Sequence, residues 1–194
     1  MRFDKTVLLT AFIALSASLT AQTHAGESMG QTPLLETSLG YTFLHANAPP
    51  GQCGCFSANG GYGSVVYNLP RGFAIVADLG AVHASNIAGT NQSITVFNYL
   101  FGPRYNFHQV SGRFMPYAQA LGGGSRETSS YAAVQDVNGA AFSLGGGITM
   151  PIDRHFAWTI MEADWIQSRL PNAQNNLQND FRIGGAMTFR MGSR

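Results

Sequence analysis

Phe181 to Phe189 reads F-R-I-G-G-A-M-T-F, and its side chains fall into two unlike sets. The first set is apolar apart from one glycine and consists of Phe181, Ile183, Gly185, Met187 and Phe189. The residues between them are small or polar: Arg182, Gly184, Ala186 and Thr188. A repeat of two residues is typical of a β-strand, in which successive side chains point to opposite faces. The stretch is therefore predicted to be an amphipathic strand.

The closing stretch also contains a short signature. A polar residue, a glycine and two spaced apolar residues follow one another as Arg182, Gly184, Met187 and Phe189. This arrangement resembles the C-terminal signal by which bacterial outer-membrane barrels are recognised for assembly. An ordinary amphipathic strand can show the same alternation, so the interpretation depends on the rest of the chain.

The N-terminus has the parts of a secretory signal peptide. A basic start is followed by an apolar run from Val7 to Leu19 and then by small residues. We expect cleavage after Ala25, with Ala21 as the alternative, so that residues 26–194 form one mature domain. The apolar run is shorter than the roughly 20 residues of a spanning helix, and later apolar runs are interrupted by glycine or polar residues. Any membrane span would then consist of strands.

The composition is poor in charge. Charged residues make up 11% of the chain, against about 25% in an average soluble protein. The only lysine, Lys5, lies in the predicted signal peptide. The formal net charge is +1, and no basic patch indicates a nucleic-acid partner. No motif indicates a cofactor.

The two-residue repeat continues through most of the mature chain, with proline, glycine and polar residues between the repeating stretches. We place Gln119 on the inner face of the fifth stretch, whose facing is the least clear. The predicted strands are Leu35–Leu44, Ser57–Tyr67, Phe73–Ala84, Thr95–Phe107, Phe114–Gly123, Ala140–Met150, Phe156–Gln167 and Phe181–Phe189.

The predicted connections between these strands alternate between long and short. Transmembrane barrels have an even number of strands of about 9 to 11 residues, with short turns at one end and long loops at the other. The predicted fold class is therefore all-β: an eight-stranded antiparallel up-and-down transmembrane β-barrel.

Alternation does not by itself say which face points outward, because a soluble lipocalin-like barrel buries its apolar face. Here the polar face consists mainly of Gly, Ser, Thr and Asn, which suits a crowded interior better than a hydrated surface. Aromatic residues near the strand ends also fit the girdles of a membrane barrel. They are Tyr41, Phe43, Tyr105, Phe107, Trp165 and Phe189.

Four stretches carry a family resemblance: G-Y-T-F-L from Gly40, Y-L-F-G-P-R-Y-N-F from Tyr99, M-E-A-D-W from Met161, and the closing strand. Together they resemble the outer-membrane β-barrel domain of the OmpA/OmpX-like superfamily. The resemblance implies a monomer in the outer membrane of a Gram-negative bacterium. It also implies contact with lipid and lipopolysaccharide, and insertion by the barrel assembly machinery. A ligand for the external loops does not follow from it.

Charged residues of both signs share the polar face: Glu36, Asp78, Glu162 and Asp164 with Arg104, Arg182 and Arg190. Eight strands leave an interior that side chains can just fill, and an unpaired charge there would be strongly unfavourable. We interpret the set as an ion-pair network within the lumen. Two carboxylates such as Glu162 and Asp164 also occur in glycosidase clefts, but the network explains them without catalysis.

Two further motifs leave alternatives open. His83 and Ser85 resemble the His and Ser of a lipid A deacylase of the PagL type, but a triad needs an acid, and none occurs between Asp78 and Arg113. Cys53 and Cys55 could form a loop disulfide in an oxidising compartment, although so small a ring would be strained. Intermolecular pairing and a metal site with His45 are the alternatives.

The sequence therefore predicts a non-enzymatic integral outer-membrane protein with a structural or surface-interaction role and a side-chain-filled lumen. The first alternative is a narrow pore. The second is a lipid A deacylase-like hydrolase that uses His83 and Ser85.

Overall fold

The computed structural model describes residues 32–46, 56–85, 91, 93–108, 113–130, 136–170 and 176–192. Its strands are β1 (Leu35–Ala46), β2 (Phe56–Asn68), β3 (Phe73–Ala84), β4 (Ile94–Asn106), β5 (Met115–Ser129), β6 (Val137–Pro151), β7 (Phe156–Ser168) and β8 (Gln178–Met191). A single 3₁₀ turn, η1 (Pro70–Gly72), joins β2 to β3 in this part of the chain. No helix within these residues is long and apolar enough to cross a membrane.

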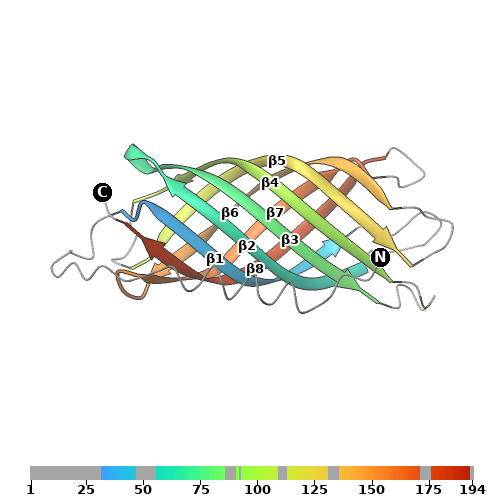
Figure 1. Cartoon of the computed structure of the whole chain (residues 1–194), viewed down its shortest axis with the longest axis horizontal. Coiled ribbons are helices and arrows are strands. Elements are labelled where there is room, and N and C mark those ends of the chain that lie inside the picture. Colours follow the sequence, from blue (N-terminus) through green and yellow to red (C-terminus); the bar gives the residue numbers. More distant parts are fainter. Residues whose placement is uncertain are drawn as a thin grey trace, which may run out of the picture.

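Each strand pairs antiparallel with its neighbours in the chain, and β8 pairs with β1 (Figure 1). The sheet is therefore a closed barrel, in which no strand is left with an unpaired edge. The predicted eight-stranded antiparallel up-and-down topology is confirmed. We call the end that carries the connections 69–72, 107–114 and 152–155 the turn end, and the opposite end the loop end.

The strand bounds agree with the prediction best at β3, which begins and ends at the predicted residues. They disagree most at β5 and β6, because the predicted loop Gly124–Gly139 largely belongs to these two strands. Ser125 pairs with Gly139 and Arg126 with Asn138, so the connection shrinks to residues 130–136. The predicted strict alternation of long and short connections is wrong here. Glycine and polar residues resemble a loop in sequence, but pairing with the next strand still satisfies their backbone groups.

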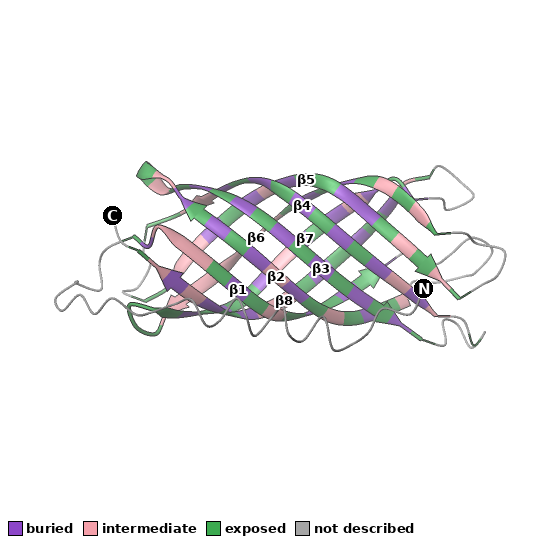
Figure 2. Cartoon of the chain, viewed as in Figure 1, coloured by how far each residue is buried: buried purple, intermediate pink, exposed green. Residues whose placement is uncertain are grey.

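Exposed residues alternate with buried or partly buried ones along much of each strand (Figure 2). In β3, for example, Leu79 is 55% exposed whereas the adjacent Asp78 is 1% exposed. Gln119 in β5 is buried, as predicted. Where a predicted strand carries charged residues, such as Asp78 in β3, its charged side thus faces the lumen and its apolar side faces outward.

A β-bulge in β7 changes which side chains face inward. The register with β8 shifts between Thr159 and Glu162, and Ile160 and Met161 are both exposed. Thr159 and Glu162 therefore both point into the lumen although they are three positions apart, an odd number. An extra residue in one strand reverses the phase of the side chains that follow it. The bulge brings Glu162 and Asp164 to the inner face.

Local chemistry defines the tight connections at the turn end. Pro70 starts η1 and Gly72 ends it with a φ of +83°, a conformation that suits glycine. Between β6 and β7, the backbone N–H groups of His155 and Phe156 donate to Oδ1 of Asp153, each at 2.7 Å. These bonds favour the ionised carboxylate and hold the pKa of Asp153 below its usual value.

Candidate functional site: the lumen of the barrel

Arg182 of β8 is the centre of the lumen. Its Nε and Nη2 atoms donate to Oδ2 of Asp164 at 3.0 and 2.8 Å. Nη2 also reaches Oε1 of Glu162 at 3.1 Å, and Nη1 reaches Oδ1 of Asp78 at 2.8 Å. All four residues are at most 3% exposed. Because β3 and β8 are not paired in the sheet, the bond between Arg182 and Asp78 crosses the interior and joins opposite walls.

Arg104 of β4 extends this cluster through Gln119. Its Nε and Nη2 atoms donate to Oε1 of Gln119 at 3.0 and 2.6 Å, and Nη2 lies 3.8 Å from Oε2 of Glu162. Gln119 in turn donates through Nε2 to Oδ1 of Asp164 at 3.0 Å. Tyr117 donates a hydrogen bond from its hydroxyl to Oε2 of Glu162. Five strands are thus connected by one buried polar network.

Two tyrosine rings lie beside the arginines. The guanidinium of Arg104 lies 3.9 Å from the ring centroid of Tyr117, and that of Arg182 lies 5.3 Å from the centroid of Tyr62. These are cation–π distances. Neither tyrosine was among the predicted site residues, although the inward facing of Gln119 implies that of Tyr117, two residues earlier.

Glycines on the inner face make room for these side chains. A Cβ atom on Gly40 would lie 2.7 Å from Cε1 of Tyr62, and one on Gly147 would lie 2.6 Å from the hydroxyl oxygen of Tyr117. A Cβ on Gly145 would lie 2.7 Å from Cγ of Asp164. These distances are too short for real carbon contacts. The glycines therefore allow large or charged neighbours to lie against the wall.

Gly40→Ala is expected to destabilise the barrel by about 1–3 kcal/mol, the usual effect of overpacking. Its Cβ would meet Cε1 of Tyr62, Cβ of Ala186 and the backbone oxygen of Gly185. Gly122→Ala is the matched control, because a Cβ at Gly122 has nothing within 4 Å. Urea unfolding of both variants in the same lipid measures the difference. Equal midpoints would contradict the assigned packing around Tyr62.

A second ion pair lies nearer the turn end. Nε of Arg190 is 3.4 Å from Oε1 of Glu36, and β1 and β8 also share a bond of 2.9 Å between the hydroxyls of Ser38 and Thr188. All seven predicted lumen residues point into the barrel. The structure groups them as a central set, formed by Asp78, Arg104, Glu162, Asp164 and Arg182, and a separate pair, Glu36 and Arg190.

Part of the lumen is apolar, which sequence reasoning missed. One buried cluster lies toward the loop end, with Phe56 packed against it, and consists of Leu44, Ala46, Ala58, Val82, Ala84, Ile94, Val96 and Ile166. A second consists of Val66, Ala74, Val76, Leu100, Leu121 and Ala141. Apolar side chains therefore flank the charged network and strengthen its electrostatic interactions.

No protein-family model matches the sequence, and no curated protein matches it either. Solved structures do match. Neisserial surface protein A (NspA) aligns with a TM-score of 0.62 at 10% identity, over 81% of this chain and 97% of that one. The N-terminal β-barrel domain of Pseudomonas aeruginosa OprF aligns with a TM-score of 0.52 at 13% identity, over 82% and 98% of the two chains.

The outer membrane protein OprG from Pseudomonas aeruginosa also aligns, with a TM-score of 0.50 at 12% identity, over 86% of this chain and 100% of that one. The chain shares the closed barrel fold of these outer-membrane proteins. At these identities the likeness concerns the fold, so the chemistry of this barrel is taken from its own residues.

His83 and Ser85 lie on the outer face of the barrel, at the loop end of β3. Nδ1 of His83 is 2.9 Å from Oγ1 of Thr95, so a hydroxyl occupies the position that the acid of a catalytic triad would take. Asp78, the nearest acid in the sequence, points into the lumen. The described residues therefore place no acid beside His83.

The predicted cysteine pair, Cys53 and Cys55, lies outside the described residues. His45, its predicted metal partner, is exposed on the outer face, with Nδ1 3.4 Å from Oγ of Ser57. Within the described ranges, no group of three or more His, Cys, Asp and Glu residues is placed to hold a metal ion.

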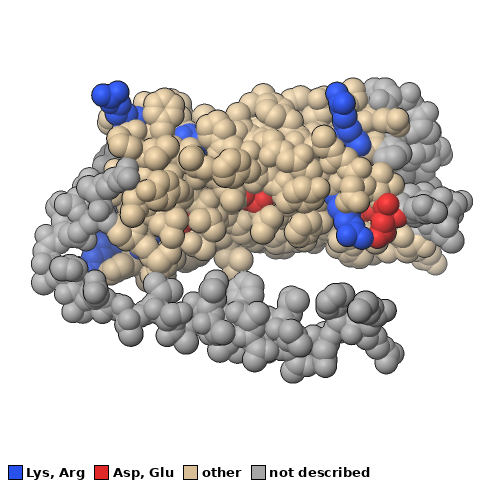
Figure 3. Space-filling model, turned by 45° about the horizontal axis from the view of Figure 1, so that its top comes forward, with Lys and Arg blue, Asp and Glu red and all other residues tan. Residues whose placement is uncertain are grey.

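The outer wall of the barrel is apolar between its two ends. On the face shown in Figure 3, the arginines lie toward the ends and the region between them is almost entirely uncharged. Leu79, Phe101 and Met187 are among the large apolar side chains exposed there. Arg126 and Asp136 form an exposed ion pair of 2.8 Å at the loop end.

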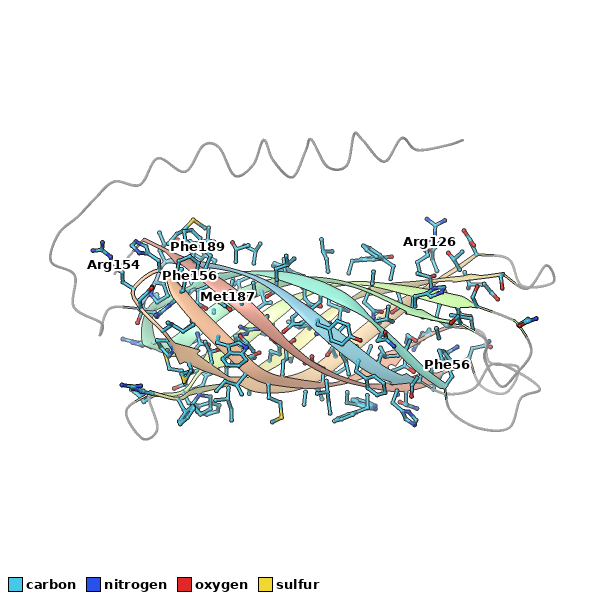
Figure 4. All side chains as sticks on the ribbon, turned by 90° about the horizontal axis from the view of Figure 1, so that it is seen from below. Phe56, Arg126, Arg154, Phe156, Met187 and Phe189 are labelled. Atoms are coloured by element: carbon cyan, nitrogen blue, oxygen red, sulfur yellow. The ribbon has the colours of Figure 1, made fainter. Side chains whose placement is uncertain are left out.

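Aromatic rings gather on the outer wall at the turn end. The ring centroids of Phe73 and Tyr105 are 5.2 Å apart, and those of Tyr105 and Phe107 are 5.1 Å apart. Phe156 and Phe189 are similarly close, at 5.4 Å; Figure 4 shows them together at the end opposite Phe56 and Arg126. The rings form a band at the position where a membrane barrel carries an interfacial girdle.

Proposed function

We propose that this chain is an integral outer-membrane β-barrel of a Gram-negative bacterium, without enzymatic activity. Its lumen is closed by its own side chains, and its role is structural or depends on surface interactions of the loops. The observation that carries the proposal is the distribution of side chains: an uncharged apolar wall encloses a buried charged network.

This distribution is the reverse of that in a protein dissolved in water. A soluble monomer rarely exposes a continuous apolar patch larger than a few hundred Å², whereas here large apolar side chains cover the middle of the barrel wall. Such a wall is suited to the hydrocarbon interior of a membrane. A closed sheet also satisfies every backbone hydrogen bond between strands, as a membrane span requires.

Residues 1–25 are proposed to act as a signal peptide that is removed after export, and the turn end is proposed to face the periplasm. Short turns on the periplasmic side and longer loops outside are the usual arrangement of these barrels. The loops at the loop end would then be available at the cell surface.

The proposal predicts that the mature protein fractionates with the outer membrane. An unheated sample should also migrate faster on a denaturing gel than a boiled sample, because a closed barrel resists unfolding by detergent. N-terminal sequencing of the purified protein checks the cleavage site. Recovery in the soluble periplasmic fraction, or a single band under both conditions, would contradict the proposal.

A narrow pore is the second candidate, and one observation favours it: a cavity of about 590 Å³ opens at the turn end of the barrel. Single-channel conductance of the refolded protein distinguishes the two functions. A lipid A mass spectrum from cells with and without the protein tests the hydrolase in parallel. Current without a change in lipid A would support the pore, and the absence of both would support the structural role.

A further inference from the structure

The side chains that line the cavity at the turn end carry an excess of positive charge. It is lined by side chains from the first residues of β1, from η1, from the ends of β4 and β8, and from the segment that joins β4 to β5. Its charged lining residues are Glu36, Arg71, Arg104 and Arg190, and His108 adds an imidazole. Three guanidinium groups therefore face one carboxylate around a volume of about 590 Å³.

Arg190 has unused hydrogen-bonding capacity in this cavity. It is 7% exposed, and the shortest contact of its ion pair with Glu36 runs from Nε to Oε1, at 3.4 Å. That Nε atom is buried and has no hydrogen-bond partner within the described residues. An arginine buried to this extent usually has most of its five N–H donors satisfied. The cavity is the space in which a ligand could accept bonds from them.

Arg71 and Arg104 also line the cavity, one near its opening and the other deeper inside. Arg71 is exposed on η1, and it makes no ion pair or hydrogen bond within the described part of the chain. Arg104 is buried, and Gln119 and the ring of Tyr117 hold its guanidinium in place. The cavity thus has one exposed arginine at its rim and two buried arginines in its wall.

We propose that this cavity binds a small soluble anion that carries a phosphate group. Guanidinium groups match the oxygens of phosphate with paired hydrogen bonds, and the single carboxylate is too little negative charge to favour a cation. The cavity exceeds the size of inorganic phosphate, so a phosphorylated small molecule fits it better. Asn68 and Asn106, linked by a hydrogen bond of 2.9 Å, add amide groups to the lining.

Glu36 has a specific role in this proposal. It holds Arg190 in place, but its charge also repels the ligand. Glu36→Gln should therefore strengthen binding of an anion severalfold, whereas the arginine substitutions should weaken it. Changes of affinity in opposite directions distinguish an anion-binding site from a general loss of structure, which would weaken binding in every variant.

The test uses the refolded full-length mature barrel in a zwitterionic detergent at constant ionic strength. Isothermal titration with inorganic phosphate and with pyrophosphate should show saturable binding, tighter for pyrophosphate. Arg190→Gln should weaken binding about tenfold and Arg71→Gln about threefold. Arg126→Gln is the control, because that residue carries the same charge but lies on the outer face at the loop end, paired with Asp136.

Gel migration before and after boiling shows which variants are folded. If Arg190→Gln does not fold, Arg71→Gln and Glu36→Gln still test whether the two kinds of substitution change the binding affinity in opposite directions. A folded wild-type barrel that binds neither probe would overturn the anion site and leave the membrane-barrel proposal unaffected. An equal loss in Arg126→Gln, or weaker binding in Glu36→Gln, would also overturn it.

Discussion

Arg182→Ala is expected to lower the free energy of unfolding of the barrel by roughly 3–5 kcal/mol. The substitution removes the only cation that contacts Asp78 and Asp164 among the described residues, and one of two that contact Glu162. Three buried carboxylates would then lie close together without their common partner. Breaking a buried ion pair on one side is much more unfavourable than removing a pair on a surface.

The same substitution should open the lumen. The side chain of Arg182 crosses from β8 to the carboxylate on β3, so its removal leaves space within the charged network of the barrel. Water is expected to enter and to solvate the carboxylates. Single-channel conductance in planar bilayers should therefore increase from a wild-type value near zero.

Arg126→Ala is the matched control for charge and residue type. The side chains of its ion pair with Asp136 are 54% and 45% exposed, and exposed pairs contribute at most about 1 kcal/mol. Urea unfolding in lipid measures both variants. If Arg182→Ala were no more destabilising than Arg126→Ala, or if the wild-type barrel conducted steadily, the lumen would be wet and its charges individually solvated.

Leu79→Arg is expected to destabilise the barrel by about 2–4 kcal/mol, the effect of an arginine at the lipid midplane of an outer-membrane barrel. Leu79 lies in the middle of β3 and is 55% exposed on the apolar wall. An arginine there would bring an unpaired charge into hydrocarbon. If the wall faced water instead, the same substitution would change stability by only about 0.5 kcal/mol.

Gly80→Ser, one residue further along, is the control for the inner face. A Cβ at Gly80 would lie 3.5 Å from Nη1 of Arg182 and 3.7 Å from Cβ of Tyr62, which are ordinary contacts. Its effect should therefore stay below about 1 kcal/mol. Urea unfolding in bilayers of phosphatidylcholine compares the pair. Equal effects would contradict the proposal that the outer wall of β3 contacts lipid.

Sequence patterns predicted the strands and the facing of their side chains well. Leu79 and Asp78 illustrate the reason: alternation depends only on the geometry of an extended chain, so it can be recognised without knowing which strands are neighbours. The same argument placed Arg182 and Asp78 on inner faces. It did not reveal that they contact each other across the lumen, since that contact depends on the closure and register of the whole sheet.

Other features could be recognised only in the tertiary structure. The bulge at Ile160 and Met161 has no clear signal in sequence, because one extra residue makes sense only against the partner strand. In the sequence, Gly40 and Gly147 are only residues of low strand propensity. The structure shows that Tyr62 and Tyr117 lie against them, which requires the absence of a Cβ.

The sequence by itself determined the class of fold and, outside the bulge in β7, the two faces of most strands, because both depend on a two-residue repeat. Only the tertiary structure decided which charges meet and where space remains. Arg182 lies among three carboxylates, whereas Arg190 reaches a single one beside an open cavity. Both are arginines on the inner face of β8, eight residues apart, and their surroundings differ because the other strands bring different side chains to each level of the barrel.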